Sequence, residues 1–217
     1  MFGFGSTNKI ANGVESWGIG PWRQSLKLAV SEVAKCFSSV TVIGFSLGGG
    51  LVAEYILSKD LDSKVESAVL LAPYLGTVEN SFLAPIVSAL GDTIDLDVVA
   101  KLASKEDIKV LESHPEAYND AIPAKAANQV VNFGKTLDNM KSSEKTDLPV
   151  KVIYSEADKT VNLSKIDSFS RAHFNNLSIE SIEKQHKIPH QLLIKHPGKE
   201  QIYDDFVEDV KSFIGKH

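Results

Sequence analysis

The sequence feature that most constrains the fold is a glycine-rich turn around Ser46. The segment before it, Val40–Phe45, is apolar nearly throughout, as in a strand that is covered on both faces of a parallel sheet. Immediately after the turn, apolar residues recur at helical spacing, at Leu51, Val52, Tyr55 and Ile56. Because a Gly-x-Ser-x-Gly turn between a strand and a helix can present a nucleophilic serine, we predict that Ser46 is a nucleophile. The alternative is a glycine-rich turn that contains an incidental serine.

Steric crowding at such a turn gives its glycines a physical role. We expect Gly44 and Gly48 to lack side chains because side chains there would clash, which leaves the Ser46 hydroxyl projecting from the sheet edge. The backbone N–H of Leu47, at the start of the helix, is expected to point to where an oxyanion would form.

Composition narrows the class of protein. The chain has 217 residues, enough for one α/β domain with an insertion, and its net charge of −5 argues against a nucleic-acid partner. No apolar run is long enough to span a membrane, and no secretory signal is visible. Cys36 is the only cysteine, so an intrachain disulfide is impossible and a cytoplasmic location is expected. We expect Cys36 to be a buried packing residue, and we expect no cofactor and no metal site.

Strands alternate with helices along the rest of the chain, which predicts a mostly parallel sheet with helices on both faces. Further strands are expected at 65–72, 150–154 and 177–182, and helices at about 22–37, 47–58, 163–173 and 199–214. An apolar stripe defines the first helix: Trp22, Leu26, Val30, Val33 and Phe37.

Residues 77–147 do not fit the simple alternation of strands and helices. About 70 residues separate two strands here, whereas a crossover connection needs far fewer. We expect short helices and turns here rather than strands, including a helix that starts near Pro123. The predicted division is therefore a first core part (1–76), a helical cap insertion (77–147) and a second core part (148–217). Two ordinary packing helices with long loops are the alternative.

A nucleophilic serine needs a base within hydrogen-bond reach, and the base needs an acidic partner. His190 is the favoured base because it lies in the loop between the last strand and the last helix; His186 and His196 in the same region are alternatives. His173 is expected to cap its own helix. Asp158, four residues past the third strand, is the favoured acid, with Glu156 as its rival. Since Ser46, Asp158 and His190 all follow strands, they should lie along one edge of the sheet.

Three ordered segments resemble the α/β-hydrolase superfamily, in particular its carboxylesterases and monoacylglycerol lipases. Gly44–Gly49 resembles the nucleophile elbow of that family, Leu148–Val161 the segment that carries the acid, and Ile188–Leu193 the histidine loop. The resemblance implies an α/β-hydrolase fold, a Ser46–Asp158–His190 triad and the strand order 40–45, 65–72, 150–154, 177–182.

The start of the chain departs from the family pattern. Met1–Ser6 already resembles the glycine-rich loop that follows the strand before the elbow, so the N-terminal part of the fold is expected to be missing. No His-Gly pair precedes Ser46, and the second oxyanion donor cannot be assigned. We expect Val40–Phe45 to lie at a sheet edge that is covered by a further N-terminal segment or by self-association, and this chain alone to be poorly active.

The activity that these observations predict is hydrolysis of carboxylic esters by Ser46, with a small-molecule substrate. Apolar residues in the expected cap favour an apolar acyl or alcohol group: Phe82, Leu83, Ile86, Val87 and Leu90. A peptidase, a thioesterase or an acyltransferase on the same triad is an alternative, as is a non-catalytic binding module of the same fold.

Overall fold

The computed structural model describes residues 18–76, 93–95, 121–141 and 143–217. Its main sheet has four parallel strands: β1 (Val40–Phe45), β2 (Val65–Leu71), β5 (Val150–Ser155) and β6 (Leu177–Ile182). They are arranged in the order β1-β2-β5-β6, which confirms the predicted order. Because parallel strands all end at the same edge, this order brings the residues after β1, β5 and β6 to one side of the molecule.

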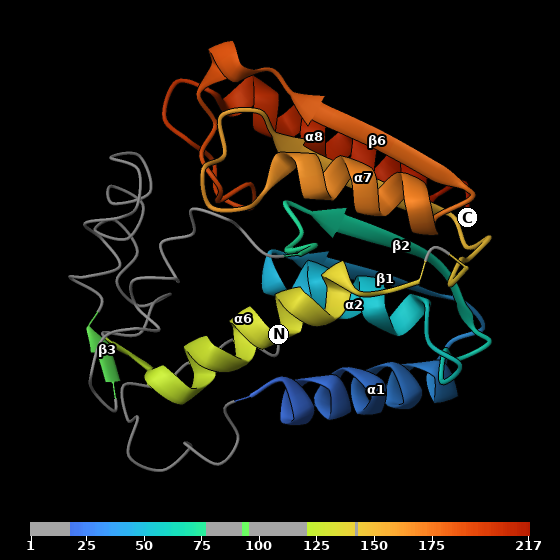
Figure 1. Ribbon diagram of the computed structural model, residues 1–217. Helices are drawn as coiled ribbons and strands as arrows, with labels where there is room; N and C mark the ends of the chain where they lie inside the picture. The colour runs from blue at the N-terminus through green and yellow to red at the C-terminus, as the bar shows by residue number, and fades with distance from the viewer. Residues whose placement is uncertain (1–17, 77–92, 96–120, 142) are drawn as a thin grey trace.

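Helices cover both faces of the sheet (Figure 1). Four of them share one apolar core with the sheet: α1 (Ile19–Cys36), α2 (Leu47–Ile56), α6 (Ala124–Asp138) and α7 (Leu163–His173). On the opposite face, α8 (Glu200–Ile214) packs through Phe206 on a second core that contains Val69, Leu71 and Ile153. The predicted α/β architecture is therefore confirmed.

Burial along the strands follows their positions in the sheet. Val69 and Leu70 in β2, and Val150 and Val152 in β5, are completely buried because these central strands are covered on both faces. The outer strand β6 instead alternates between half-buried and exposed residues. The sequence indicates both patterns, because β2 is an apolar run and β6 alternates between apolar and polar residues.

The inward face of α1 differs from the predicted stripe. Val33 and Phe37 are 44% and 61% exposed, and Ala34 is buried in their place. Phe37 follows the helix in an extended conformation, so helical spacing no longer applies to it. Cys36, in the last turn, is exposed rather than buried, which corrects the expectation of a packing residue.

Within the predicted insertion, the expectation of helices and turns without strands is wrong at two places. Strands β3 (Thr93–Asp95) and β4 (Ala121–Pro123) form a short antiparallel pair. Helix α6 follows directly after Pro123, as predicted, and its residues Phe133 and Leu137 join the main core. The five apolar residues predicted to favour an apolar substrate lie outside the described residues, so the cap remains a prediction.

No helix in the part of the chain that the structure describes has both the length and the apolar character needed to cross a membrane.

Candidate active site

Ser46 occupies a strained turn between β1 and α2. Its backbone angles are φ 53° and ψ −121°, in a region that residues other than glycine rarely adopt. Backbone hydrogen bonds fix the turn on both sides: Ser46 N–H donates to the Leu71 carbonyl at 2.9 Å, and the Ser46 carbonyl accepts from Tyr74 N–H at 2.9 Å. The neighbouring strand β2 and the segment after it therefore hold the serine in place.

Crowding around this turn explains three glycines, although not the pair expected from the sequence. A Cβ on Gly44 would lie 2.6 Å from the Gly48 carbonyl oxygen, and one on Gly49 would lie 2.8 Å from the Pro73 side chain. A Cβ on Gly50 would collide with the Tyr74 carbonyl oxygen. Around Gly48, by contrast, nothing lies within 4 Å of such a Cβ. The steric role predicted for Gly44 is confirmed, and the one predicted for Gly48 is wrong, because α2 approaches the chain after β2 at Gly49 and Gly50.

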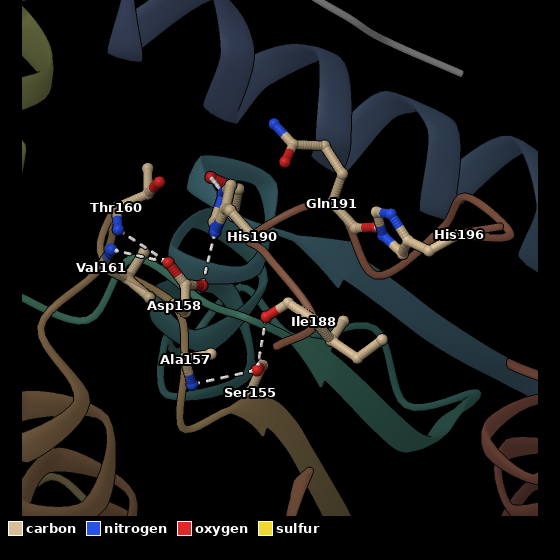
Figure 2. A network of polar contacts seen from close by, with 10 residues as sticks. Ser155, Ala157, Asp158, Thr160, Val161, Ile188, His190, Gln191 and His196 are labelled. Atoms are coloured by element: carbon tan, nitrogen blue, oxygen red, sulfur yellow. Dashed lines mark hydrogen bonds and ion pairs between the residues drawn. The ribbon is translucent and has the colours of Figure 1, made fainter. Parts of the chain in front are cut away.

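His190 stands between the serine and a carboxylate. Its Nε2 lies 2.8 Å from Ser46 Oγ. Its Nδ1 lies 2.7 Å from Asp158 Oδ2 (Figure 2). With the proton on Nδ1, the ring donates to the carboxylate and accepts from the serine hydroxyl. The predicted approach of these three side chains, which lie far apart in the sequence, is confirmed, while their roles in catalysis stay a prediction.

The Asp158 carboxylate is oriented by the turn that carries it. Its Oδ1 accepts from the N–H groups of Thr160 at 2.7 Å and Val161 at 3.4 Å, which leaves Oδ2 for His190 (Figure 2). Asp158 and His190 are both buried, so water competes little for their hydrogen bond. The rival acid Glu156 is exposed and instead accepts from Ser181 Oγ and Lys184 N–H.

The alternative bases His186 and His196, and also His173, are placed differently. His186 belongs to a short 3₁₀ helix, η4 (Lys184–His186), and His196 Nε2 lies 2.9 Å from the Gln191 carbonyl oxygen. The expectation that His173 caps its own helix is wrong: its Nδ1 lies 2.6 Å from the Glu144 carbonyl, in the segment before β5. The choice of His190 from its place in the loop therefore agrees with the geometry.

Apolar side chains enclose the histidine. The ring of Phe45, the last residue of β1, lies with its centroid 4.9 Å from that of His190. Ile188 and Leu192, on either side of His190 in the loop, are buried against α8 residues in the second core. Such surroundings strengthen the charge interactions of the site by excluding water.

Two neighbours of the site were not singled out from the sequence. The Tyr74 side chain is buried, and burial together with the nearby Asp138 carboxylate raises its pKa to about 12. Ser155 is the buried last residue of β5, and its Oγ–H donates to the Ile188 carbonyl. Tyr74 lies outside the three segments that resemble the family, and Ser155 lies in the segment that carries the acid, where nothing in its spacing marks it as a contact of the histidine loop.

Leu47 is the first residue of α2, where helical N–H groups lack partners within the helix, as its predicted oxyanion role requires. Met1–Ser6, where the resemblance placed the loop before the elbow, lies outside the described residues. Among the residues that are described, no group of three or more His, Cys, Asp or Glu side chains could hold a metal ion.

Solved structures share this fold at low sequence identity. The monoacylglycerol lipase of Paleococcus ferrophilus is 16% identical, with a TM-score of 0.66 over 90% of this chain and 76% of that one. A soluble variant of the monoglyceride lipase from Saccharomyces cerevisiae is 15% identical, with a TM-score of 0.72 over 92% of this chain and 71% of that one. A bromoperoxidase from Bacillus anthracis is 19% identical, with a TM-score of 0.58 over 92% of this chain and 75% of that one.

No protein of curated function matches the sequence. The serine aminopeptidase (S33) family does match, over residues 24–195, a range that contains Ser46, Asp158 and His190. This match covers most of the chain, and the four-stranded parallel sheet agrees with it. The chain therefore belongs to the serine aminopeptidase S33 family of α/β hydrolases.

Proposed function

We propose that this protein is a serine hydrolase that cleaves carboxylic esters through an acyl-Ser46 intermediate. The observation that carries the proposal is the continuous chain of hydrogen bonds from Ser46 Oγ through His190 to Asp158. A serine hydroxyl keeps its proton at neutral pH, and such a chain supplies the base that removes it.

The reaction follows from this geometry. Ser46 Oγ attacks the ester carbonyl carbon while His190 Nε2 takes the hydroxyl proton, and Asp158 holds the ring in the required tautomer. The Leu47 N–H donates to the oxyanion. His190 then gives its proton to the leaving alcohol oxygen, which leaves the acyl group on Ser46. A water molecule that His190 deprotonates attacks the acyl-serine and releases the carboxylic acid.

We assign an apolar acyl or alcohol group to the substrate. Phe45 forms an apolar wall beside His190, and the sequence of the predicted cap is rich in apolar residues. Two of the similar solved structures are lipases for monoglycerides, whose acyl chains have this character. A small-molecule ester with an apolar chain is therefore the substrate class that we propose.

A peptidase on the same triad is the second candidate, because the family is described by an aminopeptidase activity. The two are separated by a panel of p-nitrophenyl esters, from acetate to longer acyl chains, run beside aminoacyl p-nitroanilides. Ester turnover that increases with acyl length supports the proposal, and faster turnover of the anilides would replace it with the peptidase.

Covalent labelling tests the nucleophile directly. A fluorophosphonate probe should label the wild-type chain at Ser46, and Ser46→Ala should abolish the labelling while the fold is retained. Circular dichroism provides the control for folding. Unlabelled wild-type protein would favour a non-catalytic binding module, and undiminished labelling of the variant would place the nucleophile elsewhere.

We also propose that copies of the chain associate through β1. In the described sheet β1 pairs with β2 alone, and Ile43 in its middle is 50% exposed. An apolar edge strand of this kind favours pairing with another chain.

A further inference from the structure

Ser155 links the two loops that carry the acid and the base. Its Oγ–H donates to the Ile188 carbonyl oxygen at 2.6 Å, and Ser155 Oγ itself accepts from Ala157 N–H at 3.1 Å (Figure 2). Ser155 has no exposed surface, so water cannot substitute for either bond. One hydroxyl group therefore joins the turn after β5 to the loop after β6.

Both ends of this link lie close to the proposed triad. Ser155 comes three residues before Asp158, and the Asp158 N–H donates to the Ser155 carbonyl at 3.1 Å. Ile188 comes two residues before His190. The distance between the Asp158 carboxylate and the His190 ring therefore depends on how these two short segments are held together.

In the described structure, the other hydrogen bonds to the backbone around His190 come from within the loop or from the start of α8, where Lys199 Nζ donates to the Lys187 carbonyl at 2.8 Å. Within residues 188–195, the backbone-to-backbone bond in the described structure is internal, from Leu192 N–H to the His190 carbonyl. On the far side of His190, His196 Nε2 meets the Gln191 carbonyl, again within the loop. The Ser155 hydroxyl, in contrast, connects the loop to the end of a central strand.

We propose that Ser155 is a positioning residue that sets His190 against Asp158 by holding the Ile188 carbonyl. The inference rests on the proposed function, in which His190 is the base. A displacement of about 1 Å in a reacting group can cost on the order of 100-fold in rate, and outer-shell substitutions at metal sites cost about 10- to 100-fold. Loss of this hydroxyl should therefore reduce turnover by about 10- to 100-fold, with substrate binding unchanged.

The test uses two variants at this position and a matched control. Ser155→Ala removes the hydroxyl, while Ser155→Cys keeps a side chain of the same shape, slightly larger, that donates only weakly. Ser170→Ala is the control, because Ser170 is equally buried but lies on α7, away from the histidine loop. The measurements are kcat and KM with p-nitrophenyl butyrate, urea unfolding, and the low-field proton NMR signal of the His190 Nδ1–H.

We expect Ser155→Ala to lower kcat by about 10- to 100-fold with KM unchanged, and to weaken the low-field signal. Ser155→Cys should give an intermediate loss with near-normal unfolding, and Ser170→Ala should keep the wild-type kcat and signal. If Ser155→Ala does not fold, Ser155→Cys and its NMR signal carry the test.

Three results would overturn the inference: wild-type kcat and signal in Ser155→Ala, full activity in Ser155→Cys, or an equal loss of kcat in Ser170→Ala. Failure of the proposed function is distinguishable from all of these. It would appear as wild-type protein that neither reacts with the probe nor turns over the ester, and the NMR signal would still report whether Ser155 positions the ring.

Discussion

Gly48 and Gly50 both lie in the first turn of α2, yet their surroundings differ sharply. We predict that Gly50→Ala lowers the free energy of unfolding by about 1–3 kcal/mol, because its Cβ would collide with the Tyr74 backbone. Gly48→Ala should instead be neutral or stabilising by up to about 1 kcal/mol, because its Cβ enters open space in a helix. Urea unfolding of the two variants measures both effects. Equal destabilisation by the two substitutions would contradict this account of the turn.

At the base, we predict that His190→Ala reduces kcat by several orders of magnitude, because the members of a triad act as a unit. His186→Ala is the matched control, since His186 lies in the same region but in the short helix η4. Steady-state assays with a p-nitrophenyl ester check the pair. A large loss at His186 with none at His190 would show that the loop histidine is wrongly assigned while the family assignment stands.

The proximity of Ser46, Asp158 and His190 could be predicted from sequence because each follows a recognisable strand, and parallel strands end at one edge. The need for Gly49 and Gly50 could not, because it depends on the distance between α2 and the chain after β2. Ser155 escaped notice for a similar reason. Its partner is a backbone carbonyl 33 residues away, and no side-chain pattern marks it.

At the scale of elements, an ion cluster centred on the buried Lys151 connects α8 to the sheet, while its carboxylates are partly exposed. Lys151 in β5 is 6% exposed, and its Nζ lies 2.5 Å from Asp209 Oδ2 in α8 and 3.2 Å from Glu180 Oε2 in β6. Burial and a hydrogen bond with Asp209 raise the pKa of Glu180, against the opposing effect of Lys151. The cluster therefore makes the attachment of α8 sensitive to pH.

The sign of this effect follows from linkage. The pKa of Glu180 is higher in the folded state than its unfolded value near 4.5. Such a carboxyl group stabilises the fold below the unfolded pKa, and this stabilisation is lost as pH rises through the pKa of the folded state. Glu180→Gln mimics the protonated form, so we predict that this variant gains stability relative to the wild type as pH rises above 4.5. Urea unfolding across this range measures the difference, with Glu66→Gln, at an exposed site on β2, as the control for charge. A stability difference that is independent of pH would contradict the prediction.

Elements with strong periodicity could be predicted closely. The bounds of α7 and β6 agree with the sequence, as does the start of α6 next to Pro123. The strands β3 and β4 could not be found, because three residues are too few for an alternation to appear and their pairing is decided by the partner. The predicted inward face of α1 was wrong at the last turn, because no residue in the sequence marks where this helix ends.

At the scale of the whole molecule, the position of β1 at the edge of the described sheet predicts self-association. The chain should show a concentration-dependent mass above that of the monomer in sedimentation experiments, because Ile43 and the edge of β1 can pair with a second copy. Ile43→Lys should lower the association without changing the fold, since charged residues protect strand edges. Leu193→Lys, at an exposed apolar position in the histidine loop, is the control. A monomer at every concentration would contradict the proposal.

The strand order also governs when the site comes into existence as the chain folds. Ser46 and His190 are 144 residues apart, and two strands, β2 and β5, lie between β1 and β6 in the sheet. Their contact closes a very long loop, and contacts of this kind form slowly because the entropy of closure must be overcome first. Helices and single strand pairs can therefore appear in partly folded chains that have no assembled triad. Reactivity of Ser46 toward a covalent probe would then mark completed molecules, and a refolding chain would regain its circular dichroism before it regains that reactivity.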